Sequence, residues 1–495
     1  MENAAKIIKK IIFKVPIKTQ SPLRIGSGQD DGLTDILILK DKDGIPFIPG
    51  TSLAGVLRSE LQDVYEKENT QNGKYVADFL FGNIDEVEKE RQQSLITVSD
   101  ISFPDADIIH RDGVKIDAAT GVGEKGAKYD YEVLDRGAKG IMRLEITVRN
   151  AFLQDETLRQ IVTSNITKTR DVFCELAAVL ADLITSGIQV GSLTAKGYGK
   201  ISSIEAGTYY CFDFTEKEDV IAWLRYIDDG TLPAASYSST LPLDDSRPIE
   251  IQKMRTVNDE DFYAQIYLSV KSVLLVRDYD AASNELDDDK VVAVQLQSNG
   301  KYVIPGTSIK GVIRHQAHHI LAHFEYEDDT FENELFGFAN QSEKRGQKSR
   351  IYIDEVYIDK SNQGMQEYLQ RRNRIDRFTG GTVDGALFSE KPIYQPLEEV
   401  APVVINMKIK RCKPKEAGLV LLIIKALWLG NLTVGSGGSI GRGVLVGKKC
   451  CIRYKGRTIF IKAGAVPFVT GNAENNDNEG FLEAFVRELA GEVNG

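Results

Sequence analysis

The alternation of hydrophobic and polar residues along the chain predicts the same order of elements twice. Apolar residues recur at every second position in the expected strands and at every third to fourth position in the expected helices. In the first half, strands are predicted over residues 6–25, 36–39, 95–98 and 141–148, and helices over 52–68 and 171–185. In the second half, strands are predicted over residues 267–276, 350–353 and 403–409, and helices from residue 308 and over 418–429. Each half therefore follows an α+β order with a mostly antiparallel sheet, which ferredoxin-like units also show.

One stretch occurs in both halves almost unchanged. Ile48 begins Ile-Pro-Gly-Thr-Ser-Leu-Ala-Gly-Val-Leu-Arg, and Ile304 begins Ile-Pro-Gly-Thr-Ser-Ile-Lys-Gly-Val-Ile-Arg. A Leu-Phe-Gly motif follows each copy, and a glycine-rich segment ends each half, over residues 191–199 and 435–443. Landmarks in one order and about 255 residues apart indicate a tandem duplication.

The duplication also predicts the domain boundaries. The first domain is expected over residues 1–228 and the second over residues 259–469. Residues 229–258 are rich in Ser, Pro and Asp and are expected to form a linker. Residues 470–495 are expected to form a polar tether and a terminal amphipathic helix over 481–493.

Composition and charge narrow the class of protein. No apolar run among the 495 residues is long enough to span a bilayer, and no signal peptide is evident, so we expect a cytoplasmic protein without a membrane partner. The five cysteines form no Cys-x-x-Cys pair, which favours reduced thiols over a disulfide framework or a structural zinc site. The net charge of −11 argues against a general polyanion coat but allows a local basic groove.

The repeated stretch has the chemistry of a phosphate site. In each copy Pro-Gly turns the chain, Thr or Ser offers a helix N-cap, and a helix follows with an Arg inside it. The N-terminus of such a helix presents backbone N–H groups and the positive end of the helix dipole. A single copy of this pattern is common in proteins, whereas two copies with the same flanks favour a shared function.

The combined motifs resemble one family. Leu23-Arg24-Ile25-Gly26-Ser27-Gly28, an Asp before a strand, the Ile-Pro-Gly-Thr-Ser stretch and a closing glycine-rich loop are similar to the RAMP superfamily of CRISPR proteins. More narrowly, the chain resembles backbone subunits of type III effector complexes fused in tandem, as in type III-D variants. The resemblance implies two RRM-like RAMP domains that bind CRISPR guide RNA, contact target RNA and other effector subunits, and insert thumb hairpins, here near residues 121–135 and 380–397.

The resemblance also implies which residues face the guide RNA. They are the glycines, hydroxyls and cations of the repeated stretch, of the glycine-rich loops and of the segment beside the second thumb. These RNA-binding candidates are Gly26, Gly50, Ser52, Arg58, Lys196, Gly197, Gly306, Ser308, Lys310, Arg314, Arg374, Arg377, Gly441 and Arg442.

The family pattern places a cutting Asp at the start of the strand that leads to Ile-Pro-Gly. Asp35 has this place in the first half and is the expected catalytic residue and metal ligand. The same count back from Ile304 reaches Val291, so Asp289, just before it, is a secondary candidate. The 2′-OH of RNA is the nucleophile, and a carboxylate with a divalent metal, Mg²⁺, adds a base or charge stabilisation.

Two alternatives remain open at the level of sequence. The chain is a non-catalytic scaffold if both Asp loops are inert. It is a guide-processing endoribonuclease if His315, His319 and His323, spaced along one helix face with His318 adjacent, act as acid–base groups or metal ligands. We favour a polar helix face for these histidines, since no carboxylate or Cys in the pattern completes a ligand set. The loop over residues 435–443 lacks the Gly-Lys-Ser/Thr ending of an ATP-binding loop.

Basic runs occur near the end of the second half. They comprise Lys408, Lys410, Arg411, Lys413 and Lys415, and then Lys448, Lys449, Arg453, Lys455 and Arg457. Such runs either follow RNA phosphates or form solvated edges of strands. Solvated strand edges are the commoner case, and the phosphate role gains support only because the closing glycine-rich loop lies between the two runs in sequence. Arg371, Arg372, Arg374 and Arg377, which flank the second thumb candidate, are the better candidates for RNA contact.

Overall fold

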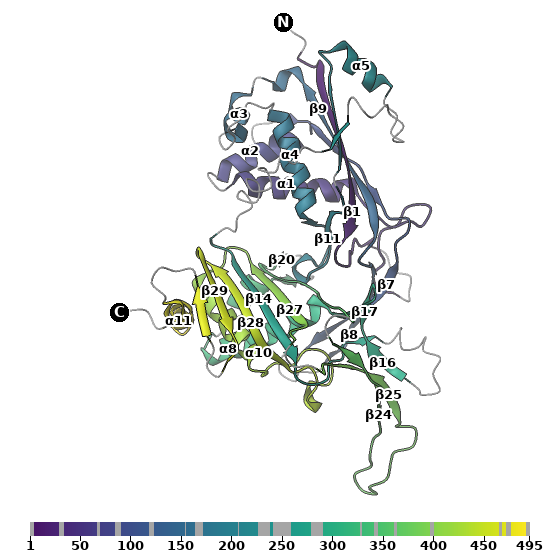
Figure 1. Ribbon diagram of the computed structural model, residues 1–495, viewed down its shortest axis with the longest axis vertical. Helices are drawn as coiled ribbons and strands as arrows, with labels where there is room; N and C mark the ends of the chain where they lie inside the picture. The colour runs from purple at the N-terminus through teal and green to yellow at the C-terminus, as the bar shows by residue number, and fades with distance from the viewer. Residues whose placement is uncertain are drawn as a thin grey trace. The chain divides into compact units, whose positions relative to one another are not determined.

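The computed structural model describes residues 4–28, 34–66, 70–84, 91–117, 123–153, 155–163, 172–205, 207–225, 238–240, 259–278, 291–326, 329–340, 345–360, 364–396, 400–464, 468–471 and 477–491 (Figure 1). The chain forms two compact units. The first comprises Met1–Gly113, Tyr129–Thr194 and Gly199–Thr256, and the second comprises Val114–Lys128, Ala195–Tyr198 and Val257–Gly495. Among the described residues, no helix is both long and apolar enough to cross a membrane.

The sheet of the first unit is built around its first strand. β1 pairs antiparallel with β9 along one edge and with β11 and β12 along the other. The strands of this sheet are β1 (Ile7–Thr19), β5 (Ile96–Val98), β9 (Lys139–Arg149), β10 (Ile188–Gln189), β11 (Lys200–Ser203), β12 (Thr208–Asp213) and β13 (Ser238–Thr240). Alternate residues of β1, such as Phe13 and Val15, are fully buried, as strict period-two patterning requires.

Helices cover one face of this sheet and complete its core. Figure 1 shows α1 (Gly50–Tyr65), α2 (Thr70–Phe81), α3 (Glu156–Thr163) and α4 (Val172–Ser186) gathered beside the sheet. Leu53, Leu57 and Leu61 recur at helical spacing along α1 and are fully buried in the same core as β1. α5 (Lys217–Leu224) contributes Ala222 to a small second cluster with Ile12 of β1.

The second unit repeats this plan with a six-stranded antiparallel sheet. Its strands follow the order β21 (Ile351–Ile353), β27 (Val403–Ile409), β14 (Phe262–Val270), β28 (Leu445–Tyr454), β29 (Arg457–Lys462) and β30 (Phe468–Gly471). α8 (Gly306–His323), α10 (Pro414–Trp428) and α11 (Asn478–Leu489) share one hydrophobic core with this sheet (Figure 1). The expected mixture of helices and largely antiparallel strands is therefore confirmed in both halves.

Further elements lie outside the two large sheets and their covering helices. In the first half they are β2 (Phe47–Ile48), β3 (Asn83–Ile84), β4 (Arg91–Gln92), β6 (Ile101–Ser102), β7 (Ile108–Ile116), β8 (Gly123–Leu134), and the 3-10 turns Asn150–Phe152 and Thr194–Lys196. In the second half they are β15 (Arg277–Asp278), β16 (Val291–Gln295), β17 (Gln297–Ser298), β18 (Lys301–Ile304), α9 (Thr330–Phe336), β19 (Phe338–Asn340), β20 (Arg345–Gln347), β22 (Val356–Ile358), β23 (Gln366–Glu367), β24 (Gln370–Arg372), β25 (Phe388–Lys391), β26 (Ile393–Tyr394) and the 3-10 turn Gly438–Ile440.

The repeated Pro-Gly stretch makes the same close contact in each half. A Cβ atom on Gly50 would lie 2.1 Å from the carbonyl oxygen of Val98, the last residue of β5. A Cβ atom on Gly306 would lie 2.8 Å from the carbonyl oxygen of Ile353, the last residue of β21. Only glycine lets the first turn of the helix approach the strand this closely. The duplication of the glycine is thus explained by packing.

The closing glycine-rich loops are also duplicated in three dimensions. The N–H of Ser192 donates to the carbonyl oxygen of Arg24 at 2.9 Å, and the N–H of Ser436 donates to that of Leu275 at 2.8 Å. The glycines just before these serines have φ of +86° and +90°, a conformation that other residues rarely adopt. Each loop is therefore fixed against the segment that follows the first strand of its own half.

Several predicted elements differ in detail from the structure. Pro49 and Pro305 are the N-caps of α1 and α8, and neither helix has the side-chain cap expected from Thr or Ser. The Ile-Pro-Gly turn places those hydroxyl residues inside the first helical turn, where they cannot cap it. The strand expected over 267–276 is β14, which starts at Phe262 and ends at Val270, because the alternation of buried residues begins there.

Three further elements were placed differently by the sequence patterns. The first thumb hairpin was expected near residues 121–135, but Gly123–Leu134 form the single strand β8, which pairs with β7. Residues 36–39 form isolated bridges in place of a regular strand. The terminal helix is α11, which begins at Asn478 because Asp477 accepts a capping bond from the Gly480 N–H. Asp289 and most of the expected linker over 229–258 lie outside the described residues.

Candidate functional site

One face of the six-stranded sheet in the second unit is free of covering helices among the described residues and combines aromatic and basic side chains. Strand register places these side chains in rows across the sheet. Tyr263 lies opposite Lys408 on one neighbouring strand and opposite Arg453 on the other. The face, called the open face below, comprises Tyr352, Asn406, Lys408, Tyr263, Gln265, Tyr267, Lys449, Cys451, Arg453 and Phe460.

Cations on the open face lie over aromatic rings. The Lys408 ammonium is 4.9 Å and the Arg453 guanidinium is 5.3 Å from the centroid of the Tyr263 ring. The Lys449 ammonium is 5.4 Å from the Tyr267 centroid and 6.0 Å from that of Phe460. These distances allow cation–π attraction, which holds the positive charges beside flat apolar surfaces.

This arrangement suits a single-stranded nucleic acid. Aromatic rings on an exposed sheet can stack on bases, and neighbouring Lys and Arg side chains can neutralise phosphates. Tyr263 and Tyr267 are half-buried, while Lys449 and Arg453 are exposed, so both kinds of group reach the surface. The basic runs in the sequence indicated the cations, but the aromatic residues were not singled out.

The corresponding face of the first unit has a different chemistry. Ile12, which points to this side of β1, is buried in the small cluster that includes Ala222 of α5. Lys10 forms an ion pair with Glu145, and Arg143 lies 3.6 Å from the same carboxylate. Charges on this face are thus engaged with one another. On the open face Lys408 also pairs with Asp261, at 3.0 Å, but Lys449 and Arg453 are exposed, and in this the two halves have diverged.

Asp35 lies at the surface beside a second carboxylate. Its N–H donates to Oδ1 of Asp130 at 3.0 Å, and its Oδ2 accepts from the Asp130 N–H at 3.0 Å. The next residues, Ile36 and Tyr131, form a parallel bridge that fixes this pairing. Asp35 is exposed and Asp130 is half-buried, so they form an acidic pair at the edge of β8. Asp130 was not identified from the sequence, because its approach depends on this long-range bridge.

The N-termini of the repeated helices make several contacts with protein groups. The Gly50 N–H donates to Oδ1 of Asp100 at 2.7 Å. The N–H groups of Ser52 and Ser308 lie 3.0 Å from the carbonyl oxygens of the preceding prolines. Gly306 is buried, and Ser52 and Ser308 are half-buried. That these residues contact RNA stays a prediction.

The repeated arginines form hydrogen bonds with the glycines of the Leu-Phe-Gly motifs. Arg58 forms an ion pair with Asp78 and donates to the carbonyl oxygen of Gly82 at 3.0 Å. Arg314 donates to Glu332 at 2.6 Å and to the carbonyl oxygen of Gly337 at 3.3 Å. Both side chains keep about two-fifths of their surface exposed, at 39% and 42%. The duplicated Arg therefore has a structural partner in each half.

Lys310 is buried inside the second unit. Its ammonium donates to Oγ of Ser349 at 2.6 Å and to the carbonyl oxygen of Ile351 at 2.9 Å. Burial, together with the positive charges of Lys196 and Arg314, lowers the pKa of Lys310 to about 7. This ammonium thus fastens α8 to the segment before β21.

Arg442 is also buried, although it lies in the closing glycine-rich loop. Its Nη1 is 2.8 Å from Glu390, and its Nη2 donates to Gln370. Glu390 also accepts from Arg277 at 3.1 Å and lies 3.6 Å from Arg372. Three arginines around one buried carboxylate join the loop to the base of the arm formed by β24 and β25.

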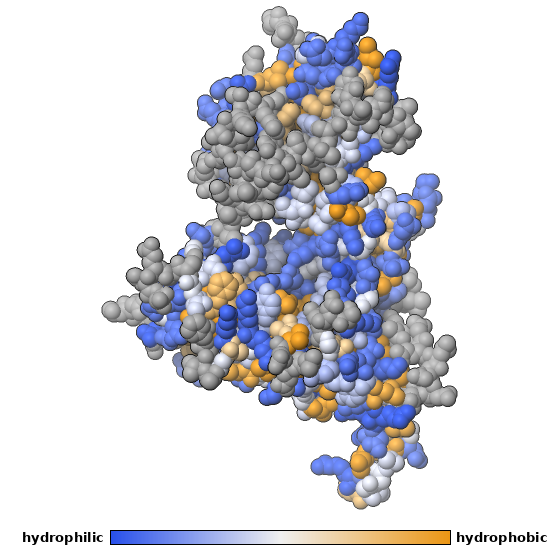
Figure 2. Space-filling model, viewed as in Figure 1, coloured by the Kyte–Doolittle hydropathy of each residue, from blue (hydrophilic) through white to orange (hydrophobic). Residues whose placement is uncertain are grey.

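The loop between β24 and β25 exposes apolar side chains. Figure 1 shows this arm projecting from the second unit, and Figure 2 shows hydrophobic residues among hydrophilic ones on it. Phe378 is 97% exposed and Ile375 is 60% exposed. Hydrogen bonds from Thr379 and Phe378 hold the loop and lower the pKa of Asp376. Arg374 and Arg377 are exposed on the same loop.

The remaining predicted residues lie in turns. Gly26 is exposed and forms an antiparallel bridge with Ile38. Lys196 ends the 3-10 turn of the first glycine-rich loop, and Gly197 follows it with φ of +88°. Gly441 follows the matching 3-10 turn of the second loop with φ of +80°. The two loops thus use the same backbone course.

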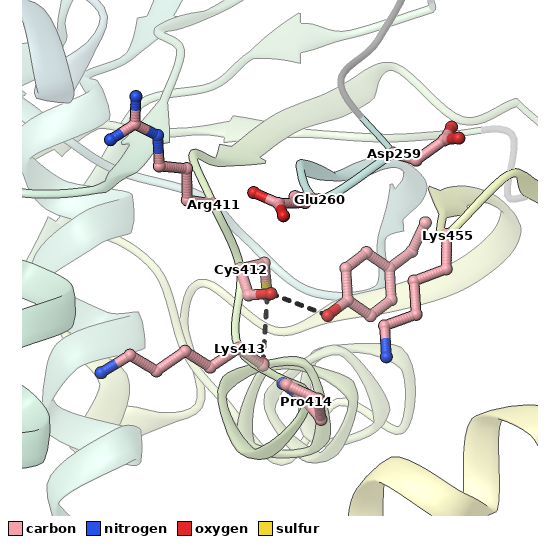
Figure 3. Close-up of a pocket in the computed structure, with 8 residues that line it drawn as sticks. Asp259, Glu260, Arg411, Cys412, Lys413, Pro414 and Lys455 are labelled. Carbon is pink, nitrogen blue, oxygen red and sulfur yellow. Dashed lines mark hydrogen bonds between the residues drawn. The ribbon is translucent and has the colours of Figure 1, made fainter. Parts of the chain in front are cut away.

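A cavity of about 530 Å³ opens where strands β27 and β28 end (Figure 3). Figure 3 shows the charged ends of Arg411 and Lys413 pointing away from Cys412. Burial, followed by the negative charge of Glu416, raises the pKa of the Cys412 thiol, which therefore stays protonated. The Tyr454 hydroxyl donates to the carbonyl oxygen of Cys412 at 2.8 Å. We assign this cavity no catalytic role.

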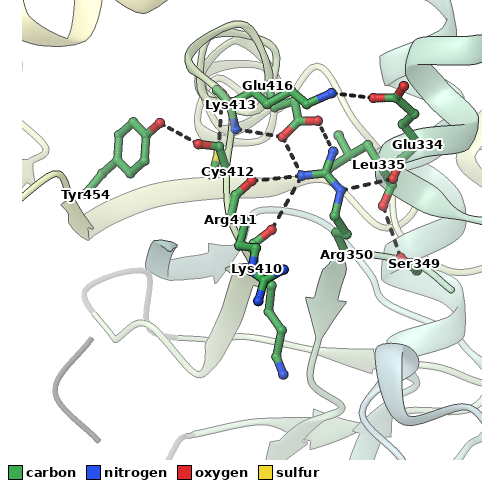
Figure 4. A network of polar contacts seen from close by, with 10 residues as sticks. All are labelled: Glu334, Leu335, Ser349, Arg350, Lys410, Arg411, Cys412, Lys413, Glu416 and Tyr454. Carbon is green, nitrogen blue, oxygen red and sulfur yellow. Dashed lines mark hydrogen bonds and ion pairs between the residues drawn. The ribbon is translucent and has the colours of Figure 1, made fainter. Parts of the chain in front are cut away.

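A polar network accounts for part of the first basic run (Figure 4). Arg350 forms a bidentate ion pair with Glu416, which is 1% exposed. Arg350 also donates to the carbonyl oxygen of Arg411 at 2.9 Å, and the Lys413 ammonium pairs with Glu334. These contacts tie β21 and α9 to the start of α10. Arg411 and Lys413 are therefore part of the scaffold, whereas Lys408 belongs to the open face.

Comparison with known proteins identifies the family. A comparison with curated proteins finds no significant match. The model of the RAMP superfamily matches residues 16–202 and 267–446, one region in each half. Proteins of this superfamily are CRISPR-associated, bind RNA and work in complexes with other subunits. Because the two matches cover most of the chain and coincide with the two duplicated units, this chain belongs to the RAMP superfamily.

Proposed function

We propose that this chain is a cytoplasmic, backbone-type subunit of a type III CRISPR ribonucleoprotein, with two RRM-like domains in a tandem form similar to type III-D variants. In this proposal it holds the guide RNA and cuts complementary target RNA beside Asp35. The superfamily match over both halves supports the RNA-binding role. The open face, with its cations stacked over Tyr263 and Tyr267, is the observation on which RNA holding rests.

The proposed grip on the guide is independent of its sequence. A CRISPR complex must accept any spacer, so contacts to phosphates and base faces are more useful than contacts to base edges. Cations and aromatic rings supply those two kinds of contact. Exposed Arg374 and Arg377 add positive charge on the arm, and Lys196 adds it on the first glycine-rich loop.

The arm formed by β24 and β25 is proposed to act as the thumb of the second half. A fully exposed aromatic residue such as Phe378 has no partner in the folded core that explains its position. Inserted between bases, it would unstack the RNA and displace one nucleotide, as apolar wedges do in bent nucleic acids. The hairpin of β7 and β8 is the proposed thumb of the first half.

Cutting is proposed to depend on the carboxylate of Asp35. A base displaced from the stack kinks the strand and can bring the 2′-OH into line with the leaving oxygen. Asp35 is exposed, so a target strand can reach it, and Asp130 adds a second carboxylate. Mg²⁺ is commonly held by one or two carboxylates with substrate phosphates, and this donor set fits it. When bound, the ion would stabilise charge developing on the phosphate.

The proposal is tested by cleavage of labelled target RNA in Mg²⁺ by the assembled complex. Asp35→Asn keeps a side-chain oxygen that can accept the Asp130 N–H but removes the charge, so folding should be preserved. We expect loss of one cleavage product, with guide content unchanged. Asp43→Asn, at an exposed turn in the same half, is the matched control and should cut normally.

Two other results would redirect the assignment. An unchanged product ladder in Asp35→Asn would leave the chain as a guide-RNA scaffold. Cleavage of repeat RNA by the chain alone, abolished in His319→Ala, would identify a guide-processing nuclease. If a cleavage product is lost in Asp35→Asn but none is lost in Asp289→Ala, the second half would be left as a domain that holds RNA without cutting it.

A further inference from the structure

We propose that the second unit contains a divalent transition-metal site formed by His318 of α8 with Asp329 and Glu332 of α9. One ligand atom from each of these three side chains lies within 4.8 Å of the other two. The sequence pattern suggested other histidines of the same helix as metal ligands, but it contained no carboxylate near them to complete the ligand set. The packing of α9 against α8 supplies two.

The spacing of the donor atoms fits a shared ion. Nδ1 of His318 and Oε2 of Glu332 are 3.2 Å apart. Two ligands bound to one zinc ion at about 2.0–2.1 Å with a tetrahedral angle are separated by about 3.3 Å. Asp329 is exposed, so its carboxylate can shift to complete the set without disturbing the core.

Arg314 orients the carboxylate of Glu332. Its Nε donates to Oε1 of Glu332 at 2.6 Å, while Oε2 faces His318. Glu332 is 9% exposed, so its two oxygens have fixed and different partners. A side chain that hydrogen-bonds to a metal-ligating residue raises metal affinity and fixes the orientation of that residue.

The position of Asp329 gives independent support. Asp329 is the N-cap residue of α9, a position at which Asp usually accepts a backbone N–H of its own helix. No such side-chain bond is made. Its carboxylate instead lies with His318 and Glu332, so two negative charges are adjacent and Arg314 supplies one positive charge against them. A bound cation would relieve that repulsion.

The other histidines of α8 are arranged differently. Nε2 of His315 and Nε2 of His319 are 3.3 Å apart and face each other. The ring of His323 packs against Phe324. His318 is therefore the histidine of this helix directed towards the carboxylates. One imidazole with two carboxylates suits Zn²⁺ or Mn²⁺, and three protein ligands leave at least one position open.

The site is tested on the full-length chain after removal of metal with a chelator. Titration calorimetry with ZnCl₂ and electron paramagnetic resonance with MnCl₂ are done on a chain that also carries Asp35→Asn, which removes the metal site proposed above, and each should show one bound ion. Asp329→Asn, which removes an exposed charge, should weaken binding at least about tenfold. Its melting temperature without metal should equal that of the parent chain. His323→Ala, on the same helix, is the control and should bind as the parent does.

The outcomes separate this site from its alternatives. A rise in melting temperature with metal, lost in Asp329→Asn and kept in His323→Ala, supports the site. Binding that survives in Asp329→Asn and in Glu332→Gln would overturn it. Binding abolished only in His315→Ala or His319→Ala would also overturn it and place the ion on that pair. None of these readouts depends on RNA.

Discussion

Replacement of Lys310 by Met should change how the stability of the second unit depends on pH. The Lys310 ammonium is buried and bonded to Ser349 and to the carbonyl oxygen of Ile351. Burial, with the nearby charges of Lys196 and Arg314, lowers its pKa to about 7 from the usual 10.5. Met keeps a flexible apolar stem of similar length without a titrating group.

The direction and size of the effect follow from the two pKa values. In the unfolded chain this lysine keeps its proton up to about pH 10.5, whereas in the folded unit it loses the proton near pH 7. The unfolded state therefore binds more protons between these values, and the free energy of unfolding rises with pH. Each pH unit of full difference is worth about 1.4 kcal/mol, so raising the pH from 7 to 9 should add about 2 kcal/mol.

The two tryptophans of the chain allow the second unit to be followed by itself. Trp223 lies in α5 and Trp428 lies in α10. Urea unfolding of a Trp223→Phe chain at pH 6, 7, 8 and 9 then reports on α10 by fluorescence. With Lys310 present, the free energy of unfolding should rise by about 2 kcal/mol between pH 7 and 9. In Lys310→Met this rise should be absent. Equal pH profiles for the two proteins would refute the assigned pKa.

Further predictions test the packing, the polar network and the arm. Gly50→Ala should destabilise the first unit by at least about 2 kcal/mol, because its Cβ would lie 2.1 Å from a carbonyl oxygen of β5. Gly55→Ala is the control: its Cβ would meet no atom within 4 Å, so thermal unfolding should show no such loss of stability. Arg350→Met should cost about 3–5 kcal/mol in the Trp fluorescence assay, because Glu416 would be buried without its partner. Phe378→Ala should change stability by less than about 0.5 kcal/mol, since the side chain is 97% exposed, yet alter the target-RNA cleavage pattern.

Local patterns were sufficient to predict much of the fold. β27 covers the residues 403–409 expected from alternation, and α4 lies within one residue of the predicted helix over 171–185. Each of these elements buries one face, so its apolar residues recur at the spacing typical of a strand or a helix, and this spacing can be recognised in the sequence. The duplicated Ile-Pro-Gly stretch likewise marked the start of α1 and α8. Its N-cap differed because Pro49 and Pro305 precede the expected hydroxyl residues.

The candidate sites were predicted less completely, because their partners are distant in sequence. Arg442 was expected at RNA but is buried against Glu390, which lies on β25, far from Arg442 in sequence. His318 acquires its carboxylates from α9, and no spacing within α8 indicates them. The open face depends on strand register, which sets Arg453 beside Tyr263. Long-range packing decides each of these contacts.

The most direct test of the account is ultraviolet crosslinking of the complex purified with its RNA, followed by mass spectrometry of the crosslinked peptides. Aromatic residues that stack on bases should crosslink efficiently. We predict nucleotide adducts on the β14 peptide that contains Tyr263 and Tyr267 and on the β29 peptide that contains Phe460. A complex that contains RNA but shows adducts only outside the open face would contradict the assignment of this face as the RNA-holding surface.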